Sequence, residues 1–390
     1  MREGWKEVEL GEIAFYVKDK IEADKLNSDN YISADNMIGN VGGITKSEYV
    51  PESGKSSYFI EGDILVSNIR PYFKKMWYAT FSGGCSNDVF IIRTKDILVD
   101  SKYLFYRLSN QDFFDFMMAG ANGTKMPRGN KNAIITFNIN LPPLETQRKI
   151  ASILSGYDDL IENNLKRIKI LEEMAQQTYE EWFVRMRFPG HESATINPET
   201  GLPEGWEKVK LSELMDIEGG TQPPKSQWKD DLEDGYVRMI QIRDYYTSSH
   251  IAYVLDKKVK KCNKYDVMIA RYGASVGRIC YGLDGAYNVA LVKVIPQKDY
   301  YIEFLRWYLK SENFQNTLIG MSQRTAQDGF NKDTFNGIQI LKPTEDVFKL
   351  FQKYGMTILK SIFNLQDQNQ RLREARDILL PRLMMGMIEV

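Results

Sequence analysis

The side chains most often used for catalysis are few in this 390-residue chain and stand in no catalytic spacing. It has three cysteines, Cys85, Cys262 and Cys280, and two histidines, His191 and His250. Three scattered cysteines predict neither a disulfide framework nor a zinc site, and they are typical of reduced cytoplasmic thiols. Neither histidine has the spacing of a metal site or of a nucleophilic triad. We expect His191 in a solvated loop and His250 in a turn or at the start of a strand.

Three short motifs come near to catalytic patterns without matching them. An adenine methyltransferase needs an Asn/Asp-Pro-Pro-aromatic loop around a flipped base. The Pro-Pro pairs here, LPPL and QPPK, have neither Asn or Asp before them nor an aromatic residue after. GASVGR (273–278) lacks the spacing and the Lys-Ser/Thr pair of a phosphate loop, and the Asp-x-Lys triplets at 100–102 and 256–258 are common by chance. We expect this chain to hold no catalytic residue, metal or cofactor.

Composition narrows the class of protein further. The length favours two or more domains. The formal net charge of −1 argues mildly against a simple, uniformly basic nucleic-acid binder, although a total can hide local basic patches. No apolar run approaches the length of a membrane span, and the first residues lack the apolar core of a signal peptide. These features predict a cytoplasmic protein.

The chain repeats itself after half its length. EGWKEVELGEI (3–13) and EGWEKVKLSEL (204–214) share six of eleven residues, and Trp5 and Trp206 stand 201 positions apart. EGDILVSNIR (61–70) and KYDVMIARYG (264–273) both predict an Asp followed by a buried strand. INLPPLE (139–145) aligns with IQILKPTE (338–345). The sequence therefore predicts a tandem duplication of about 200 residues.

Each half ends in a long amphipathic helix. Apolar residues recur every seven positions in both, at Leu154, Ile161, Ile168, Ala175 and Trp182, and at Phe351, Ile358, Leu365, Leu372 and Leu379. Such stripes are typical of coiled-coil seams, although a single stripe also fits an ordinary surface helix. Because the stripes match and both follow a duplicated unit, we expect the helices to pair with each other, antiparallel if the halves are related by a twofold-like rotation. Asn164 and Asn369 fall on the seam.

The predicted fold class is α+β, with two similar α/β domains separated by two long helices that pair as an antiparallel coiled coil. The expected boundaries are a first domain at 1–142, a central helix at 143–190, a second domain at 191–342 and a C-terminal helix at 343–390.

At this point the residues resemble a known family. LPPLETQRKIASILSGYDDLIENNLKRIKILEEMAQQTYEEWF (141–183) and RLREARDILLPRLMMGMIEV (371–390) are similar to the helical regions of the specificity subunits of Type I restriction-modification systems. DILVSNIRPYFKKMWYATFSGGCSNDVFIIR (63–93), GGTQPPKS (219–226) and MIARYGASVGRI (268–279) resemble segments of their target-recognition domains. The resemblance covers essentially the whole chain.

The resemblance implies a function without chemistry in this chain. Each target-recognition domain would read one half of a split sequence in double-stranded DNA, and the paired helices would set the unread gap. The helices would also dock two modification subunits, which use S-adenosylmethionine to methylate adenine. Restriction subunits, which use ATP and Mg, would join them to translocate on and cut unmodified DNA.

DNA binding needs cations for phosphates and planar donors for base edges, and two segments of the first half offer them. RPYFKK (70–75) gathers Arg70, Tyr72, Lys74 and Lys75, and NGTKMPRGNKN (122–132) gathers Lys125, Arg128 and Lys131 without an acid. Solvated loops are the alternative. In the second half the candidates are Gln222, Lys225, Arg271, Tyr272, Arg278, Gln323, Arg324, Gln327 and Lys332.

The aromatic residues Trp182 and Phe183 near the end of the first helix predict a docking surface for a modification subunit, with packing on the second helix as the alternative. For the whole chain, the rival interpretation is a coiled-coil scaffold without DNA recognition. Such a scaffold would keep the helices and need no basic, glycine-rich loops.

Overall fold

The computed structural model describes residues 4–95, 98–121, 123, 126–246, 250–322, 330 and 332–390, without the side chains of Ala274, Ile319, Met321, Ser322 and Lys332. Two compact units divide the chain: Met1–Asn163 with Gln368–Val390, and Asn164–Asp367. Each unit therefore contains a globular domain and part of both long helices. Within the described ranges, no helix is long and apolar enough to cross a membrane.

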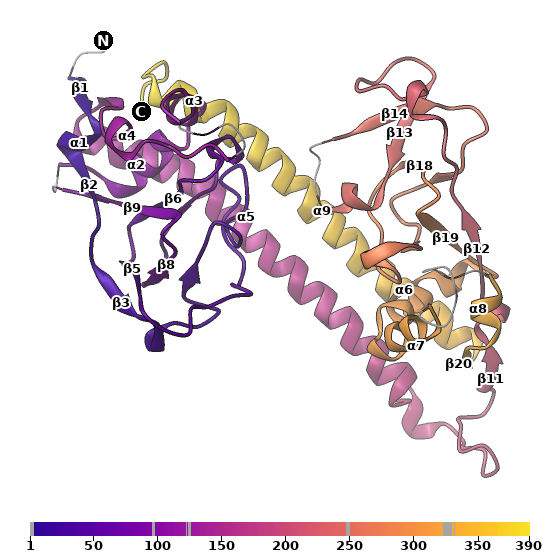
Figure 1. The fold of residues 1–390 in the computed structure, drawn as a ribbon. Helices are drawn as coiled ribbons and strands as arrows, with labels where there is room; N and C mark the ends of the chain where they lie inside the picture. Colours follow the sequence, from indigo (N-terminus) through magenta and orange to yellow (C-terminus); the bar gives the residue numbers. More distant parts are fainter. Residues whose placement is uncertain are drawn as a thin grey trace. The chain divides into compact units, whose positions relative to one another are not determined.

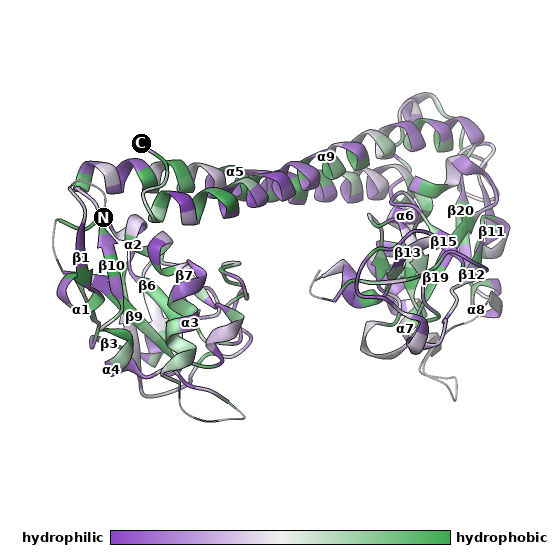
Figure 2. Ribbon diagram, turned by 90° about the horizontal axis from the view of Figure 1, so that it is seen from above, coloured by the Kyte–Doolittle hydropathy of each residue, from purple (hydrophilic) through white to green (hydrophobic). Residues whose placement is uncertain are grey.

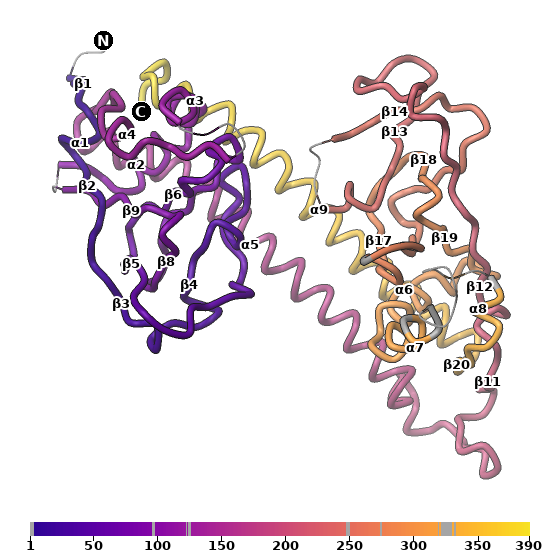
Figure 3. Tube along the Cα trace, viewed as in Figure 1, coloured from indigo at the N-terminus to yellow at the C-terminus, as the bar shows by residue number. Residues whose placement is uncertain are grey.

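Two four-stranded sheets form the first unit (Figure 1). One is antiparallel, in the spatial order β2 (Ala14–Tyr16), β9 (Val89–Thr94), β6 (Ile64–Ser67) and β7 (Met76–Tyr78). The other has the order β3 (Lys20–Glu22), β5 (Lys55–Phe59), β8 (Gly83–Cys85) and β4 (Tyr31–Ile32). In Figure 3 β4 lies beside β8, with which it runs parallel. Strands β1 (Lys6–Glu9) and β10 (Asn138–Leu141) pair separately.

Short helices complete this unit: α1 (Leu10–Ile13), α2 (Ser101–Leu108), α3 (Gln111–Ala119), α4 (Lys131–Ile134) and the 3₁₀ turns η1 (Ala23–Lys25) and η2 (Pro71–Phe73). Strand β6 shows how the sheet is buried on both faces. Ile64 and Val66 pack in a cluster with helix residues such as Leu104, whereas Leu65 packs with Phe59 of the other sheet. Successive side chains of a strand point to opposite faces, so the all-apolar run ILV suits a central layer.

The second unit repeats this plan. Its antiparallel sheet has the order β12 (Met215–Gly219), β19 (Leu291–Pro296), β16 (Met268–Ala270) and β17 (Ile279–Cys280). Its mixed sheet has the order β14 (Ala252–Leu255), β13 (Tyr236–Ile240), β18 (Gly285–Tyr287) and β15 (Lys261–Cys262). The remaining elements are β11 (Glu207–Lys210) paired with β20 (Gln339–Lys342), helices α6 (Ile302–Lys310), α7 (Glu312–Ser322) and α8 (Lys332–Asn336), and the 3₁₀ turns η4 (His191–Ser193), η5 (Leu211–Glu213), η6 (Lys225–Gln227), η7 (Ile242–Tyr245), η8 (Gly273–Ser275) and η9 (Asp299–Tyr301).

The two units differ at one sheet edge. Three strands of the mixed sheet correspond: β4, β8 and β5 in the first unit match β13, β18 and β15 in the second, with one parallel and one antiparallel pair in each. The fourth strand is added on opposite sides, because β3 extends the sheet beside β5 whereas β14 extends it beside β13. The predicted duplication is confirmed, and the halves have diverged in topology as well as in sequence.

The long helices are α5 (Leu144–Tyr179), continued by the π-helical turn η3 (Glu180–Val184), and α9 (Glu345–Met384). Hydrophobic and hydrophilic positions alternate around both (Figure 2). In the first unit the Asn369 Nδ2 donates to the carbonyl oxygen of Ile161 at 3.3 Å. In the second, the hydroxyls of Thr178 and Tyr354 lie 3.0 Å apart. The first half of α5 thus meets the second half of α9 in the first unit, and the second half of α5 meets the first half of α9 in the second unit, which confirms the predicted antiparallel pairing.

The seam positions proposed from the sequence are enclosed to different degrees. Leu154, Ile161, Ala175, Phe351, Ile358 and Leu365 are buried, and Ile168, Leu372 and Leu379 are half-buried. Asn164 and Asn369 are only 7% and 2% exposed. A buried polar residue costs stability in a seam but favours one register over its neighbours, and the Asn369 bond to α5 provides such a register-specific contact.

Candidate nucleic-acid interface

In the first unit, the fold brings together two loops that the sequence predicted separately. The segment after β6 and the loop before α4 pair through their backbones. The Arg70 N–H donates to the Pro127 carbonyl at 2.8 Å, and the Gly129 N–H donates to the Asn68 carbonyl at 3.1 Å. Arg70 and Arg128 therefore belong to one surface, although 58 positions separate them in the sequence.

The η2 turn presents aromatic rings between cations. Arg70 and Lys74, on either side of it, have left-handed backbones with φ of 49° and 50°, a conformation that is sparsely populated for residues other than glycine and is often found at functional sites. The rings of Tyr72 and Phe73 are exposed, with centroids 4.6 Å apart. Lys74 is half-buried, whereas the Lys75 ammonium donates to the Ala34 carbonyl and so has a contact inside the unit.

A short turn before β9, residues 86–88, lies against both loops. The Asn68 N–H donates to the Asp88 carbonyl at 2.7 Å, and the Arg128 guanidinium lies 3.1 Å from the Asp88 carboxylate. Lys131 is near this surface as well, with its ammonium 5.7 Å from the centroid of the Phe90 ring. The predicted contact Lys125 lies outside the described residues.

The second unit builds the corresponding surface from corresponding positions. The Arg271 N–H donates to the Ala290 carbonyl at 2.8 Å, and its Nε donates to the Phe330 carbonyl at 2.9 Å. The segment after β16 thus meets the turn before β19 and the loop before α8. Gln323, Arg324 and Gln327 lie outside the described residues, and Lys332 is described by its backbone alone, at the start of α8.

Aromatic rings accompany the arginines of the second unit. The Arg271 guanidinium carbon lies 5.1 Å from the Tyr272 ring centroid, and that of Arg278 lies 4.0 Å from the Tyr246 centroid. Tyr272, Tyr246 and Arg278 are exposed. Tyr246 was missed by sequence reasoning, although RDYY (243–246) has the same basic-aromatic character as RPYF (70–73). Such pairs suit nucleic acid, because arginine neutralises phosphates and an exposed ring can stack on a base.

The third predicted segment of the second unit is held beside β18. The Thr221 N–H donates to the Tyr287 carbonyl at 3.0 Å, and the Thr221 hydroxyl accepts from the Lys260 N–H at 3.2 Å. Gln222 and Lys225 are both exposed on it. This segment therefore borders the end of β18, three residues before Ala290, which accepts the Arg271 N–H.

Polar atoms without partners gather under these surfaces. Several of the buried side-chain atoms that lack a hydrogen bond within the described ranges belong to these segments and the adjoining turns: Asn68 Oδ1, Arg70 Nε and Ser86 Oγ in the first unit, and Asn288 Oδ1 in the second. A buried polar group without a partner costs about 1–3 kcal/mol, so such a concentration is typical of a surface that is completed by water or a ligand.

The cysteines have no place in this interface. All three are free and buried, and burial raises the pKa of Cys85 and Cys262 to about 12 and that of Cys280 to about 11. Because only the thiolate is a nucleophile, the folded chain should react poorly with alkylating reagents. We expect iodoacetamide at pH 8 to modify the folded chain about 100-fold more slowly than the urea-unfolded chain. Equal rates, followed by mass spectrometry, would contradict this protonated, enclosed state.

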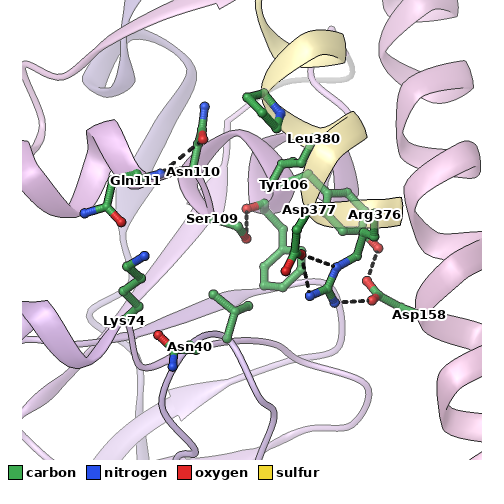
Figure 4. Close-up of a pocket in the computed structure, with 13 residues that line it drawn as sticks. Asn40, Lys74, Tyr106, Ser109, Asn110, Gln111, Asp158, Arg376, Asp377 and Leu380 are labelled. Atoms are coloured by element: carbon green, nitrogen blue, oxygen red, sulfur yellow. Dashed lines mark hydrogen bonds and ion pairs between the residues drawn. The ribbon is translucent and has the colours of Figure 1, made fainter. Parts of the chain in front are cut away.

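A cavity of about 480 Å³ lies where the first globular domain meets the helices of its unit (Figure 4). Arg376 of α9 pairs with Asp158 of α5 at 2.6 Å, and the Tyr106 hydroxyl of α2 donates to the same carboxylate at 2.6 Å. Burial and the neighbouring Asp158 raise the pKa of Tyr106, so this phenol keeps its proton. Lys74 of the candidate interface lines the opposite side of the cavity. The cavity thus lies between Lys74 of the candidate interface and the ion pair of the two helices.

The predicted docking residues have different environments in the second unit. Phe183 is 3% exposed and packs against Phe304 and Phe351, which favours the packing alternative for this residue. Trp182 is half-buried, with its ring stacked on Tyr354 at 6.3 Å, and it lines an open groove with Met174 and Glu181.

No cluster of His, Cys, Asp and Glu suitable for a metal ion occurs among the residues that the structure describes. The Asp-x-Lys triplets are accounted for in other ways. Asp100 caps α2 by accepting from the Tyr103 N–H at 2.9 Å, and Asp256 pairs with Lys261 at 3.0 Å.

Comparisons with known proteins agree with this arrangement. The profile of the Type I restriction modification DNA specificity domain matches twice, at residues 2–173 and 203–375. The HindI specificity subunit of Haemophilus influenzae is 25% identical, over 98% of this chain and 99% of that protein. The MjaVIII specificity subunit of Methanocaldococcus jannaschii is 26% identical, over 100% of this chain and 94% of that protein.

A solved structure shows the same fold. The S subunit of a Type I restriction-modification system from M. genitalium superposes with a TM-score of 0.62 at 15% identity, covering 97% of this chain and 96% of that one. With both halves matched by the family profile, the chain belongs to the Type I restriction-modification DNA specificity family, and its part in such a system is DNA specificity and not catalysis.

Proposed function

We propose that the chain reads a bipartite target in double-stranded DNA, one half-site with each unit. The observation that carries this proposal is the equivalence of the two surfaces. In each unit, the first residue after β6 or β16 donates its N–H to the last residue of the turn before β9 or β19. The same segment also binds the loop before α4 or α8, through backbone groups in the first unit and through the Arg271 side chain in the second. The side chains on these shared backbones differ, which suits two unlike half-sites.

In this proposal the helices set the unread gap and dock two modification subunits, which supply adenine methylation from S-adenosylmethionine. Restriction subunits using ATP and Mg complete the nuclease. The first long helix carries nearly balanced charge, with eight acids and seven bases at 145–187, so it is suited to protein partners and not to phosphates. By itself the chain should bind DNA weakly and with strong salt dependence.

The direct test is a map of methylated adenines in cells that contain the chain and its modification subunit. Methylation at one split motif, lost when this chain alone is absent, supports the proposal. Methylation that persists without the chain, with the modification subunit shown to be active, refutes it and favours the scaffold. The scaffold interpretation also predicts that neutralising Arg70, Lys125, Arg128, Arg271 and Arg324 together leaves function intact.

Arg278 gives a test of phosphate contact. Its exposed guanidinium lies over Tyr246, so replacing it by Ala removes a surface charge without opening the core. We expect Arg278→Ala, in the assembled methyltransferase, to lose about one phosphate contact with DNA. The plot of the logarithm of the DNA-binding constant against the logarithm of salt concentration should then become less steep by about one. Lys169→Ala on α5, a residue whose side chain is largely exposed, is the matched control. Equal slopes for both variants, measured by fluorescence anisotropy, would remove Arg278 from the interface.

Trp182 gives a test of docking. Because it lines an open groove while remaining stacked on Tyr354, its replacement by Ala should weaken assembly with a modification subunit by about tenfold or more. Circular dichroism should show the folded helices unchanged. Normal affinity in sedimentation experiments would place the docking surface elsewhere on the chain.

A further inference from the structure

We infer that Asn87 and Val289 are specificity-determining residues that contact base edges, Asn87 for the half-site of the first unit and Val289 for that of the second. This inference rests on the proposed function and adds to it two residues that lie outside the basic segments. They are the middle residues of two corresponding turns, 86–88 before β9 and 288–290 before β19.

The first turn is fixed at both ends. The Ser86 N–H donates to the carbonyl of Ile32, the last residue of β4, at 2.9 Å. Asp88 receives the Asn68 N–H at 2.7 Å on its carbonyl and the Arg128 guanidinium at 3.1 Å on its carboxylate. The turn therefore joins the ends of two parallel strands to both basic loops of this unit.

The second turn is fixed in the same way. The Asn288 N–H donates to the carbonyl of Ile240, the last residue of β13, at 3.1 Å. Ala290 accepts the Arg271 N–H at 2.8 Å. Gly220 approaches so closely that a Cβ there would lie 2.2 Å from the Asn288 carbonyl oxygen. The first turn is thus bonded to both basic loops of its unit, and the second turn adjoins the Arg271 and Gly220 segments. Both turns are held by the backbone, whatever the middle side chain is.

The middle side chains are free to meet a ligand. Asn87 is exposed, and its amide has no hydrogen bond within the described ranges. Val289 is 41% exposed. Single exposed apolar residues are ordinary on protein surfaces. What distinguishes Val289 is its position between Arg271 and the Gly220 segment. A rigid turn with an exposed tip is suited to reading because it positions the contacting group in advance.

Asn87 and Val289, at the tips of the two turns, differ in chemistry and are suited to different bases. An asparagine amide pairs bidentately with N6 and N7 of adenine in the major groove, whereas an apolar side chain contacts the methyl group of thymine. The inference therefore assigns an adenine to the base contacted by Asn87 and a thymine to that contacted by Val289.

The test is a reciprocal exchange, Asn87→Val and Val289→Asn, in the assembled methyltransferase. Both changes are made at exposed turn residues. We expect Asn87→Val to alter the preference at one adenine of one half-site by about tenfold, and Val289→Asn to alter one thymine of the other half-site by a similar factor. The gap and the remaining bases should not change. Leu255→Asn, an exposed apolar position on β14, is the matched control and should leave the motif unchanged.

Sequencing-based maps of methylated adenine separate the outcomes. If the wild-type chain specifies a split motif and both exchanged variants specify the same motif, the inference is wrong while the proposed function stands. If both variants alter the same half-site, the assignment to two units is wrong. If methylation does not depend on the chain, the proposed function fails and the inference fails with it. Asn87→Ser and Val289→Ala, which shorten the tips, provide the same readout should an exchanged chain fail to fold.

Discussion

Replacing Arg306 by methionine is expected to lower the free energy of unfolding of the second unit by about 3–5 kcal/mol, because it leaves a buried carboxylate without its partner. Arg306 and Glu303 on α6 are both fully buried. The Arg306 Nη2 lies 3.0 Å from Glu303 Oε1 and also donates to the Tyr265 carbonyl at 2.7 Å. The guanidinium carbon lies 4.6 Å from the Tyr281 ring centroid.

This ion pair is also adjacent to α9. Gly355 has no side chain where α9 passes over Glu303, and a Cβ there would lie 3.0 Å from Glu303 Cβ and from its Oε2. The Glu303 N–H donates to Gln352 Oε1 at 3.1 Å. The pair therefore lies at the junction of the second globular domain with a long helix, and its loss should loosen that junction.

Hydrogen exchange in α6, together with urea unfolding, measures the effect. The control is the double variant Glu303→Leu with Arg306→Met, since replacing both members of a buried pair by apolar residues is often neutral or stabilising. We expect the double variant to recover most of the lost stability. A single Arg306→Met variant as stable as the wild type would show that Glu303 is not held as a buried anion.

Removing one heptad from both helices should shorten the gap between the half-sites by about three base pairs, since seven residues of helix span about 10 Å and a base pair about 3.4 Å. The suitable deletions are 162–168 in α5 and 364–370 in α9, which include Asn164 and Asn369 together. They leave Asp158 and Arg376 in the first unit, and Glu172 and Phe363 in the second, at their contacts with the globular domains. A seven-residue deletion also preserves the seam.

The expected methylation map contains both original half-sites at a new spacing. Deleting the α5 heptad alone should instead impair pairing and assembly, because the two seams would lose their register. An unchanged gap in a double-deletion variant that still folds and methylates would show that the helices do not determine the spacing.

Much of the fold could be predicted because its signals are local or repeated. The seven-residue spacing from Leu154 to Ala175 predicts a helix by itself, and the matching stripe from Phe351 to Leu379 identifies its partner. The buried run at 64–67 was evident from its composition. The edge strand β3 was not predicted, and for β14 the sequence indicated only a turn or strand start at His250. They are short and partly polar, and their placement depends on which neighbouring strand is free to pair.

The candidate site was less predictable, since its geometry is tertiary. Basic residues in glycine-rich loops indicated Arg70 and Arg128 separately, but only the fold brings the Arg70 N–H to the Pro127 carbonyl. The turns that contain Asn87 and Val289 have one charged residue between them, Asp88. Their sequences therefore show no charge pattern that would indicate a DNA contact. Their importance follows from the bonds that surround them. Tyr246 was missed because a tyrosine within a basic-aromatic stretch is equally common in a core.

The first unit is made of two separate stretches of the chain, and this affects the order in which the protein can fold during synthesis. Residues 164–367 form the second unit from one continuous stretch, whereas the first also needs 368–390. Ile150 and Leu154 pack with Leu383 and Met384, so the first domain to leave the ribosome keeps an apolar surface uncovered until the second has been made. A nascent chain would then depend on chaperones at its older half, and loss of residues 368–390 would damage the domain that was synthesised first.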